Sequence, residues 1–174
     1  MKDKIIETIN RAIEKYFELE KEEKKFVPGN TRIQFAGPVF DEKEIKASLS
    51  SLLTGWFTAG DFTRKFEESF AKFLNAKSCF TVNSGSSALM VAWNTLKNKA
   101  LDNPIKDEDE IITSALTHTA TANSVLLNNL KLVLVDADQG TYNINANLIE
   151  DAVTDKTKGI LPMHFLGNPC EMDK

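Results

Sequence analysis

The sequence is poor in the residues that build disulfide frameworks and metal knuckles. It has two cysteines and two histidines among its 174 residues. Cys79 and Cys170 lie far apart and show no Cys-x-x-Cys spacing, which argues against both kinds of scaffold. We therefore expect two reduced thiols, and we expect Cys79, which stands in an apolar run, to pack in the core.

An excess of basic charge and a long apolar run are also missing. Lys and Arg number 21 against 25 Asp and Glu, for a formal net charge of -4, and no basic stripe could follow a phosphate backbone. No apolar run approaches the roughly 18 residues of a bilayer span, and residues 1–4 lead into a charged amphipathic stretch instead of a signal-peptide core. We predict a cytoplasmic protein with neither nucleic acid nor a membrane as its partner.

What is present indicates a packed protein with a helical N-terminal arm. Hydrophobic residues make up 42% and charged residues 26% of the chain, enough for a folded core. Apolar residues from Ile5 to Phe17 recur at spacings of three and four, which predicts an amphipathic helix. Residues 26–30 contain Pro and Gly and read as an extended linker with a turn. Residues 1–40 are therefore assigned to a helix and linker.

Two more helices are expected before the chain changes character. Asp41 with Glu44 forms a capping-box pattern that predicts a helix over about 42–54. Asp61 is the predicted cap of the next helix, which Asn75 closes. That helix carries an aromatic stripe at helical spacing, which we expect to lie in the core: Phe62, Phe66, Phe70 and Phe73.

After residue 77 the pattern changes to short apolar runs that alternate with helical segments. Four strands are predicted, at 78–82, 110–114, 132–135 and 159–163. Helices are predicted between them, at 86–97, 120–130 and 148–153. Continuous apolar strands alternating with helices are typical of a mostly parallel sheet covered on both faces. The predicted fold class is therefore α/β, with three α/β/α layers.

The first candidate site is the turn from the strand predicted at 78–82 into the next helix. Gly85 would let a ligand approach the backbone, the first helical N–H groups lack partners, and Ser86 and Ser87 add hydroxyl donors. This arrangement suits a phosphate group. It lacks the Lys of a P-loop and the three glycines of a dinucleotide fingerprint. The alternative is an ordinary Ser-rich helix cap without a ligand.

Two histidines fall at the predicted carboxyl edge of the sheet, where ligands of parallel α/β folds bind. His118 follows the strand at 110–114 among several threonines, and His164 follows the last strand. The alternative for His118 is a partly exposed loop residue beside a helix that Thr117 or Thr119 caps. A hydrogen-bonded structural role is the alternative for His164.

Taken together, four ordered motifs resemble the DegT/StrS family of pyridoxal-phosphate sugar enzymes. They are Ser84-Gly85-Ser86-Ser87-Ala88-Leu89, Thr117-His118-Thr119-Ala120-Thr121-Ala122-Asn123, Val135-Asp136 with Thr141-Tyr142-Asn143-Ile144, and His164 with Gly167-Asn168-Pro169. The segment 55–60 and Phe66-Glu67 fit as well, so the resemblance runs from about residue 26 to the end. Within the family the chain is most similar to the branch of lipopolysaccharide biosynthesis protein RfbH and CDP-4-keto-6-deoxyglucose 3-dehydrase.

The resemblance implies a fold and a cofactor. It implies that residues 41–174 are an incomplete large domain of the fold type I PLP-dependent transferase fold. The implied cofactor is pyridoxal 5'-phosphate or pyridoxamine 5'-phosphate. Gly85, Ser86 and Ser87 would hold its phosphate, and His118 would stack on its ring, where most relatives carry Phe, Tyr or Trp. A second departure is Glu108, where the family usually has Gly.

The resemblance also implies a reaction and partners for the complete enzyme. The implied reaction is C3 dehydration of a CDP-4-keto-6-deoxyhexose in deoxysugar and O-antigen biosynthesis. The implied partners are a nucleotide-linked 4-keto-6-deoxy sugar, a second subunit in a homodimer, and a reductase. The catalytic Lys or His and the ligands of a [2Fe-2S] cluster would lie beyond Lys174, and the chain alone would be inactive. The alternatives are a nucleotide-sugar aminotransferase and a non-catalytic remnant.

Overall fold

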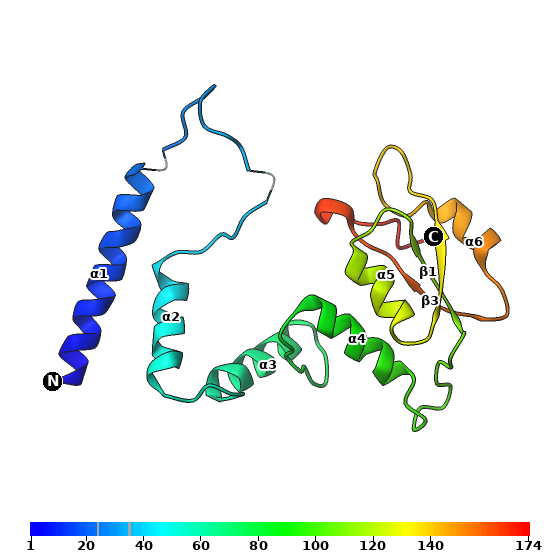
Figure 1. The fold of residues 1–174 in the computed structure, drawn as a ribbon, viewed down its shortest axis with the longest axis horizontal. Coiled ribbons are helices and arrows are strands. Elements are labelled where there is room, and N and C mark those ends of the chain that lie inside the picture. Colours follow the sequence, from blue (N-terminus) through cyan, green and yellow to red (C-terminus); the bar gives the residue numbers. More distant parts are fainter. Residues whose placement is uncertain (24, 35) are drawn as a thin grey trace. The chain divides into compact units, whose positions relative to one another are not determined.

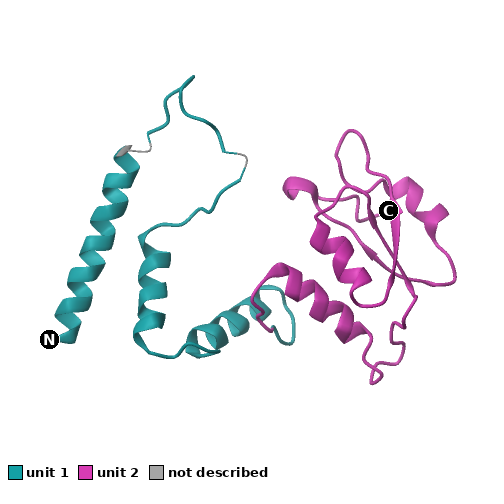
Figure 2. Ribbon diagram, viewed as in Figure 1, with its two compact units in different colours: residues 1–79 teal, residues 80–174 magenta. Residues whose placement is uncertain are grey.

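A computed structural model describes residues 1–23, 25–34 and 36–174. The chain divides into two compact units, residues 1–79 and residues 80–174 (Figure 2). The predicted boundary near residue 40 differs from this division and stays a prediction.

The first unit contains the three predicted helices: α1 (Lys2–Glu23), α2 (Glu42–Leu53) and α3 (Asp61–Phe73). α1 and α2 are held together by the buried ring of Phe17, which lies 5.8 Å from that of Phe40, and by an ion pair of 2.5 Å between Lys46 and Glu14. α2 begins as predicted, because the Asp41 carboxylate accepts from the Lys43 N–H while Glu44 accepts from the Asp41 N–H.

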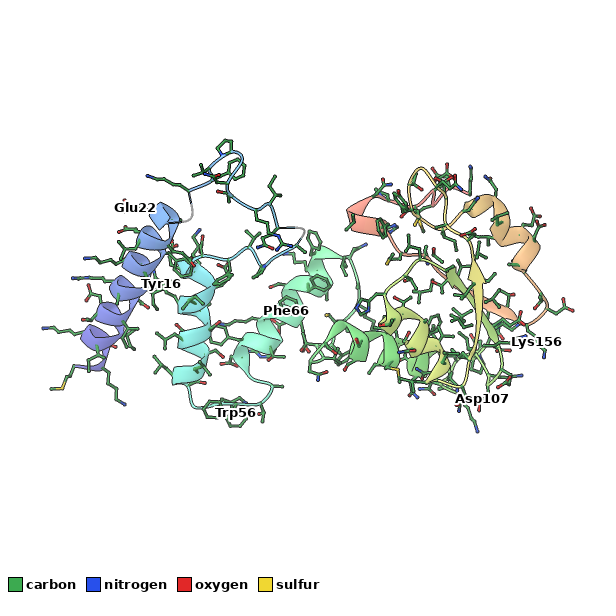
Figure 3. The ribbon with its side chains drawn as sticks, turned by 45° about the horizontal axis from the view of Figure 1, so that its top comes forward. Tyr16, Glu22, Trp56, Phe66, Asp107 and Lys156 are labelled. Carbon is green, nitrogen blue, oxygen red and sulfur yellow. The ribbon has the colours of Figure 1, made fainter. Side chains whose placement is uncertain are left out.

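Two predictions about α3 are wrong. Its cap is Gly60, and Asp61 is the first helical residue, whose carboxylate accepts a hydrogen bond from Arg64 at 3.1 Å. The phenylalanine stripe is not core: Phe66, which is labelled in Figure 3, is 53% exposed, and Phe73 is 81% exposed. Helical spacing alone does not supply a partner surface, and among the described residues of this unit only Phe17 and Ala71 are buried apolar side chains. The predicted end holds, since Asn75 adopts a φ of 52°.

The second unit is built on three parallel strands in the order β2-β1-β3, of which β1 and β3 are labelled in Figure 1. They are β1 (Glu110–Ser114), β2 (Lys131–Val135) and β3 (Thr157–Leu161). The helical segments are α4 (Gly85–Leu96), α5 (Thr119–Leu126), η1 (Ala146–Leu148), α6 (Ile149–Ala152) and η2 (Phe165–Gly167). Every residue of β1 is buried, as expected for a central strand covered on both faces.

The two faces of the sheet carry separate apolar clusters. Ile111 of β1 packs with Trp93 of α4 and Val125 of α5. Its neighbour Ile112 points to the other face, where its cluster includes Cys170 and contacts α6. Helices therefore lie on both sides of the sheet, which confirms the predicted three-layer α/β arrangement.

The prediction of a strand at 78–82 is wrong, because this segment forms no strand in the described structure. Its apolar side chains are exposed, with Phe80 at 83%, and Cys79, expected in the core, is only half-buried. A strand requires a hydrogen-bonded neighbour, and β1, β2 and β3 pair only with one another in the parts of the chain described.

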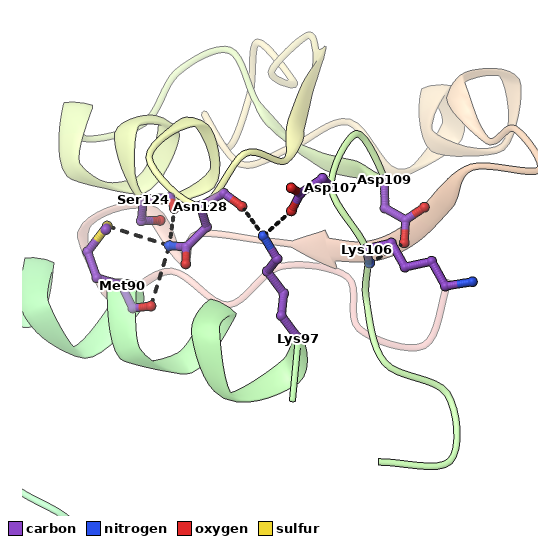
Figure 4. A network of polar contacts seen from close by, with 7 residues as sticks. All are labelled: Met90, Lys97, Lys106, Asp107, Asp109, Ser124 and Asn128. Carbon is purple, nitrogen blue, oxygen red and sulfur yellow. Dashed lines mark hydrogen bonds and ion pairs between the residues drawn. The ribbon is translucent and has the colours of Figure 1, made fainter. Parts of the chain in front are cut away.

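A polar network ties the ends of α4 and α5 to the turn before β1 (Figure 4). The Lys97 ammonium pairs with the Asp107 carboxylate and donates to the Asn128 carbonyl at 2.7 Å. The amide of Asn128 donates to the Ser124 carbonyl at 2.8 Å. Lys97 also holds the pKa of Asp107 below its usual value.

None of the helices in the described residues is both long and apolar enough to cross a membrane.

Candidate functional site at the carboxyl edge of the sheet

The loop before α4 is organised by three hydrogen bonds among its own polar side chains. Ser84 caps the helix, because its Oγ accepts from the Ser87 N–H at 3.1 Å. The Ser87 hydroxyl donates to the Asn83 side-chain oxygen at 2.7 Å and accepts from the Ser84 hydroxyl at 3.1 Å. The N–H and the hydroxyl of Ser87 therefore hold this loop in its shape.

The remaining donors of this loop fit an anionic group. Within the described residues, the N–H groups of Gly85 and Ser86 have no hydrogen-bond partner, and the Ser86 side chain is exposed. A Cβ built on Gly85 meets nothing within 4 Å, so the space beside it is open. The first turn of α4 carries no acidic residue that would repel an anion. Helix N–H groups aligned with the helix dipole favour phosphate binding in such a place.

His118 is the residue that caps α5. Its Nδ1 accepts a hydrogen bond from the Ala120 N–H at 3.1 Å, which fixes the ring at the start of the helix. Neither Thr117 nor Thr119 takes this role. Because Nδ1 is an acceptor, the ring proton of the neutral imidazole is on Nε2. The side chain is exposed, so the ring is accessible to a ligand.

The two predicted parts of the site lie on the same side of the sheet. Trp93 of α4 and Val125 of α5 share one apolar cluster against Ile111, and the Trp93 indole donates to the Ser124 hydroxyl at 3.1 Å. α4 and α5 run side by side in Figures 1 and 4. The roles of Gly85, Ser86, Ser87 and His118 stay predictions.

The loops after β2 and β3 are joined by a residue to which the sequence analysis gave no role. Asn143 is 4% exposed. Its side-chain oxygen accepts from the Phe165 N–H at 2.8 Å, and its amide donates to the carbonyls of Asn168 at 3.1 Å and Pro169 at 3.0 Å. The signal in the sequence was its place in a family motif, but which segment it binds depends on two loops that only the sheet brings together.

Asp138 shapes the turn that presents Asn143. Its carboxylate accepts from the N–H groups of Gly140 and Thr141, both at 2.9 Å, and from the Thr141 hydroxyl at 3.1 Å. The Thr141 donors, with that of Gly140, hold the pKa of Asp138 below its ordinary value. This carboxylate is therefore a structural acceptor within its own turn.

His164 lies in the loop after β3 and is anchored much as His118 is. Its Nδ1 accepts from the Cys170 N–H at 3.0 Å, and its side chain is exposed. The residue before it, Met163, contacts the Thr117 hydroxyl at 3.5 Å through its sulfur. The loops that carry the two histidines are therefore neighbours.

The described residues contain a cavity outside the predicted site, but no metal centre. A cavity of about 790 Å³ lies at the start of α3, lined in part by Trp56, Arg64 and Glu67, and it contains none of the four predicted site residues. Among the described residues, no group of three or more His, Cys, Asp or Glu side chains is placed to hold a metal ion.

Comparisons with known proteins identify relatives. A sequence model of the DegT/DnrJ/EryC1/StrS aminotransferase family matches residues 38–174. Lipopolysaccharide biosynthesis protein RfbH of Salmonella typhimurium is 37% identical over 97% of this chain and 39% of its own length. A dTDP-4-dehydro-2,6-dideoxy-D-glucose 3-dehydratase of Saccharopolyspora spinosa is 36% identical over 99% of this chain and 37% of its own.

Solved structures agree with these relatives. A GDP-4-keto-6-deoxymannose-3-dehydratase with a trapped PLP-glutamate geminal diamine superimposes with a TM-score of 0.74 at 35% identity, over 82% of this chain and 36% of that one. A sugar aminotransferase structure from Streptococcus pneumoniae, in its PLP form, gives 0.72 at 29% identity, over 82% and 35%. The fold class and family predicted from the sequence are confirmed.

The comparisons bear less directly on the cofactor and the substrate. Both structural relatives hold PLP, and the names of the two 3-dehydratase relatives specify nucleotide-linked sugars as the substrates of those proteins. The expected iron–sulfur cluster finds no support in them. The chain spans little more than a third of the length of these relatives.

Proposed function

The chain belongs to the DegT/DnrJ/EryC1/StrS aminotransferase family, and from this premise we propose that it is the cofactor-binding part of a PLP- or PMP-dependent nucleotide-sugar enzyme. The proposed reaction of the whole enzyme is C3 dehydration of a 4-keto-6-deoxyhexose linked to CDP. The observation that carries the proposal is the pairing of an open helix N-terminus at Gly85 with an anchored, exposed ring at His118 on the same side of the sheet.

Each residue has a distinct task in this proposal. The N–H groups of Gly85 and Ser86 and the Ser86 hydroxyl bind the cofactor phosphate. Ser87, held by Ser84 and Asn83, keeps the loop in the shape that exposes these donors. His118 lies against the cofactor ring and orients it. When bound, the cofactor supplies an electron sink for the bonds that break at the sugar.

The dehydrase is preferred to the aminotransferase because two of the sequence relatives that cover nearly the whole chain are RfbH and a 3-dehydratase. An aminotransferase is the second candidate, favoured by the likeness to the Streptococcus pneumoniae structure. Should the coding sequence continue past Lys174, a downstream Ser-Phe-x-x-x-His would support the dehydrase and a Ser-Phe-x-x-x-Lys the aminotransferase. A homodimer, a reductase partner and inactivity of the chain alone are further proposals.

Binding of pyridoxamine phosphate tests the proposal, because this ligand has no aldehyde to react with surface lysines. Titration followed by ³¹P NMR should show a saturable change of the phosphate signal. Pyridoxamine without its phosphate, whose binding is followed by the ¹H signals of its ring, should bind much more weakly. Equal affinity for the two ligands, or no change of the ³¹P signal, would contradict the assignment.

The variant Gly85→Asp sharpens this test. Its side chain enters open space, and a carboxylate at the first helical position is favourable to the helix dipole, so the fold should be retained. The same carboxylate should repel the phosphate and weaken binding by at least about tenfold, equivalent to about 1.4 kcal/mol. Asn147→Asp adds the same charge at an exposed residue of η1 and should leave binding unchanged.

A further inference from the structure

The loop after β3 meets the loop that carries His118. β1 and β3 are adjacent and parallel, with Thr113 in register with Leu161, and the Thr113 hydroxyl donates to the Leu161 carbonyl at 2.7 Å. The segments that follow β1 and β3 therefore leave the sheet at the same edge. A few residues further on, Thr117 contacts Met163 at 3.5 Å. Each contact residue immediately precedes a histidine.

The imidazole of His164 has one nitrogen committed and one available. Nδ1 accepts from the Cys170 N–H at 3.0 Å, so the proton of the neutral ring is on Nε2. Nε2 has no hydrogen-bond partner among the described residues, and the side chain is exposed. The protein thus holds one nitrogen of the ring, and the side chain is accessible to a ligand.

The loop that carries His164 is held by a buried residue. Asn143 makes three hydrogen bonds to residues 165–169, and Cys170 at the end of the loop is buried in the cluster around Ile112. The Cys170 thiol also donates to the Met163 carbonyl at 3.3 Å, which closes the loop around His164. Ordering such a loop costs conformational entropy in each residue. Preorganisation of this kind is typical of ligand-contacting groups.

We infer that His164 is a second ligand-contacting residue, which donates a hydrogen bond from Nε2 to an oxygen of the bound cofactor, and that Asn143 is its positioning residue. This inference rests on the proposed function, since the ligand is the same pyridoxamine phosphate that Gly85 and His118 are proposed to hold. It adds a residue from the loop after β3 to a site otherwise formed by the starts of α4 and α5.

The chain offers an unusually clean test, because it contains two histidines. Their ring signals in ¹H–¹⁵N or ¹H–¹³C NMR spectra are assigned from His118→Asn and His164→Asn. Addition of pyridoxamine phosphate to the wild-type chain should shift both sets of signals with one dissociation constant. His164→Asn should weaken binding about 2- to 10-fold, as expected for loss of one hydrogen bond.

The role of Asn143 is tested in the same spectra. In Asn143→Ala, with the fold checked by the dispersion of backbone amide signals, the ligand should still shift the His118 signals while the shift at His164 is reduced by more than half. Asn147→Ala, at an exposed position, is the matched control and should behave as the wild type. A variant that merely lost stability would change both histidines alike.

The outcomes of these experiments distinguish the inference about His164 from the proposed function on which it rests. A saturable ³¹P change with shifts at His118 and none at His164 would overturn the inference and leave the cofactor site standing. No change of the ³¹P signal or of either ring would overturn both. Equal loss of both histidine shifts in Asn143→Ala would refute the positioning role.

Discussion

His118 has two roles that substitution can separate, and this gives the sharpest prediction. The ring caps α5 through Nδ1 and, by the proposed function, also stacks on the cofactor. Asn is among the best capping residues but has no ring, so His118→Asn should keep the helix start and lose the stacking. Phe has a flat ring but no acceptor, so His118→Phe should keep the stacking and leave the Ala120 N–H unpaired.

The expected changes in ligand affinity and in stability follow from the interaction that each variant loses. An aromatic contact contributes about 0.5–1.5 kcal/mol beyond the area that it buries, so His118→Asn should weaken pyridoxamine phosphate binding about 2- to 10-fold. Its urea unfolding midpoint should stay near that of the wild type. Loss of a helix cap costs about 1 kcal/mol, so His118→Phe should be less stable by about that amount and bind the ligand at least as well as the wild type.

Urea unfolding and ³¹P-monitored titration measure the two effects independently. Inorganic phosphate is the control ligand, since it uses the α4 donors but no ring, and its affinity should be equal in the wild type and in both variants. The reasoning is refuted if His118→Asn binds pyridoxamine phosphate as tightly as the wild type, or if His118→Phe is the weaker binder of the two variants.

Three predictions concern stability. Asn143→Ala removes three hydrogen bonds made by a buried side chain and should lower the free energy of unfolding by about 2–3 kcal/mol in urea titrations, whereas Asn147→Ala should change it by less than about 0.5 kcal/mol. Equal values would refute the role given to Asn143. Glu108 has a φ of 67°, so Glu108→Gly should raise stability by about 0.5–1 kcal/mol, while Glu108→Ala should not, because Ala keeps the left-handed strain; a gain with Ala would point to charge instead. The Thr154 hydroxyl and then the Lys131 ammonium lower the pKa of Glu110, so its contribution is present above the unfolded-state value of about 4.3 and is lost as pH falls through the folded value; urea midpoints of Glu110→Gln should lie below the wild type at pH 7 and converge with it in acid, and a constant gap would contradict this.

The parts of the fold that sequence predicted well are those decided by local chemistry. The capping box at Asp41 involves neighbouring residues, and the structure forms it as predicted. The left-handed turn at Asn75 is local in the same way. The buried strand at 110–114 was visible as a continuous apolar run, because both of its faces are covered.

The errors fall where a distant partner decides the outcome. The segment 78–82 has strand composition, but a strand exists only with a neighbour to receive its hydrogen bonds. The stripe that contains Phe66 has helical spacing, but spacing does not say which surface covers it. The sequence also did not reveal that His118 is itself the cap of α5, a role for which Thr117 and Thr119 were the candidates.

By itself the sequence determined the family and the α/β class, and it indicated which residues are candidates to bind a phosphate and to stack on a ring. Motifs, caps and apolar periodicity are properties of short segments and can be read from the sequence. The tertiary structure decided which of these segments meet. Asn143, Thr117 and His164 come from three separate loops, and only the parallel pairing of β2, β1 and β3 brings those loops to one edge. Contacts between residues so far apart along the chain depend on the register of the sheet, which no local pattern encodes.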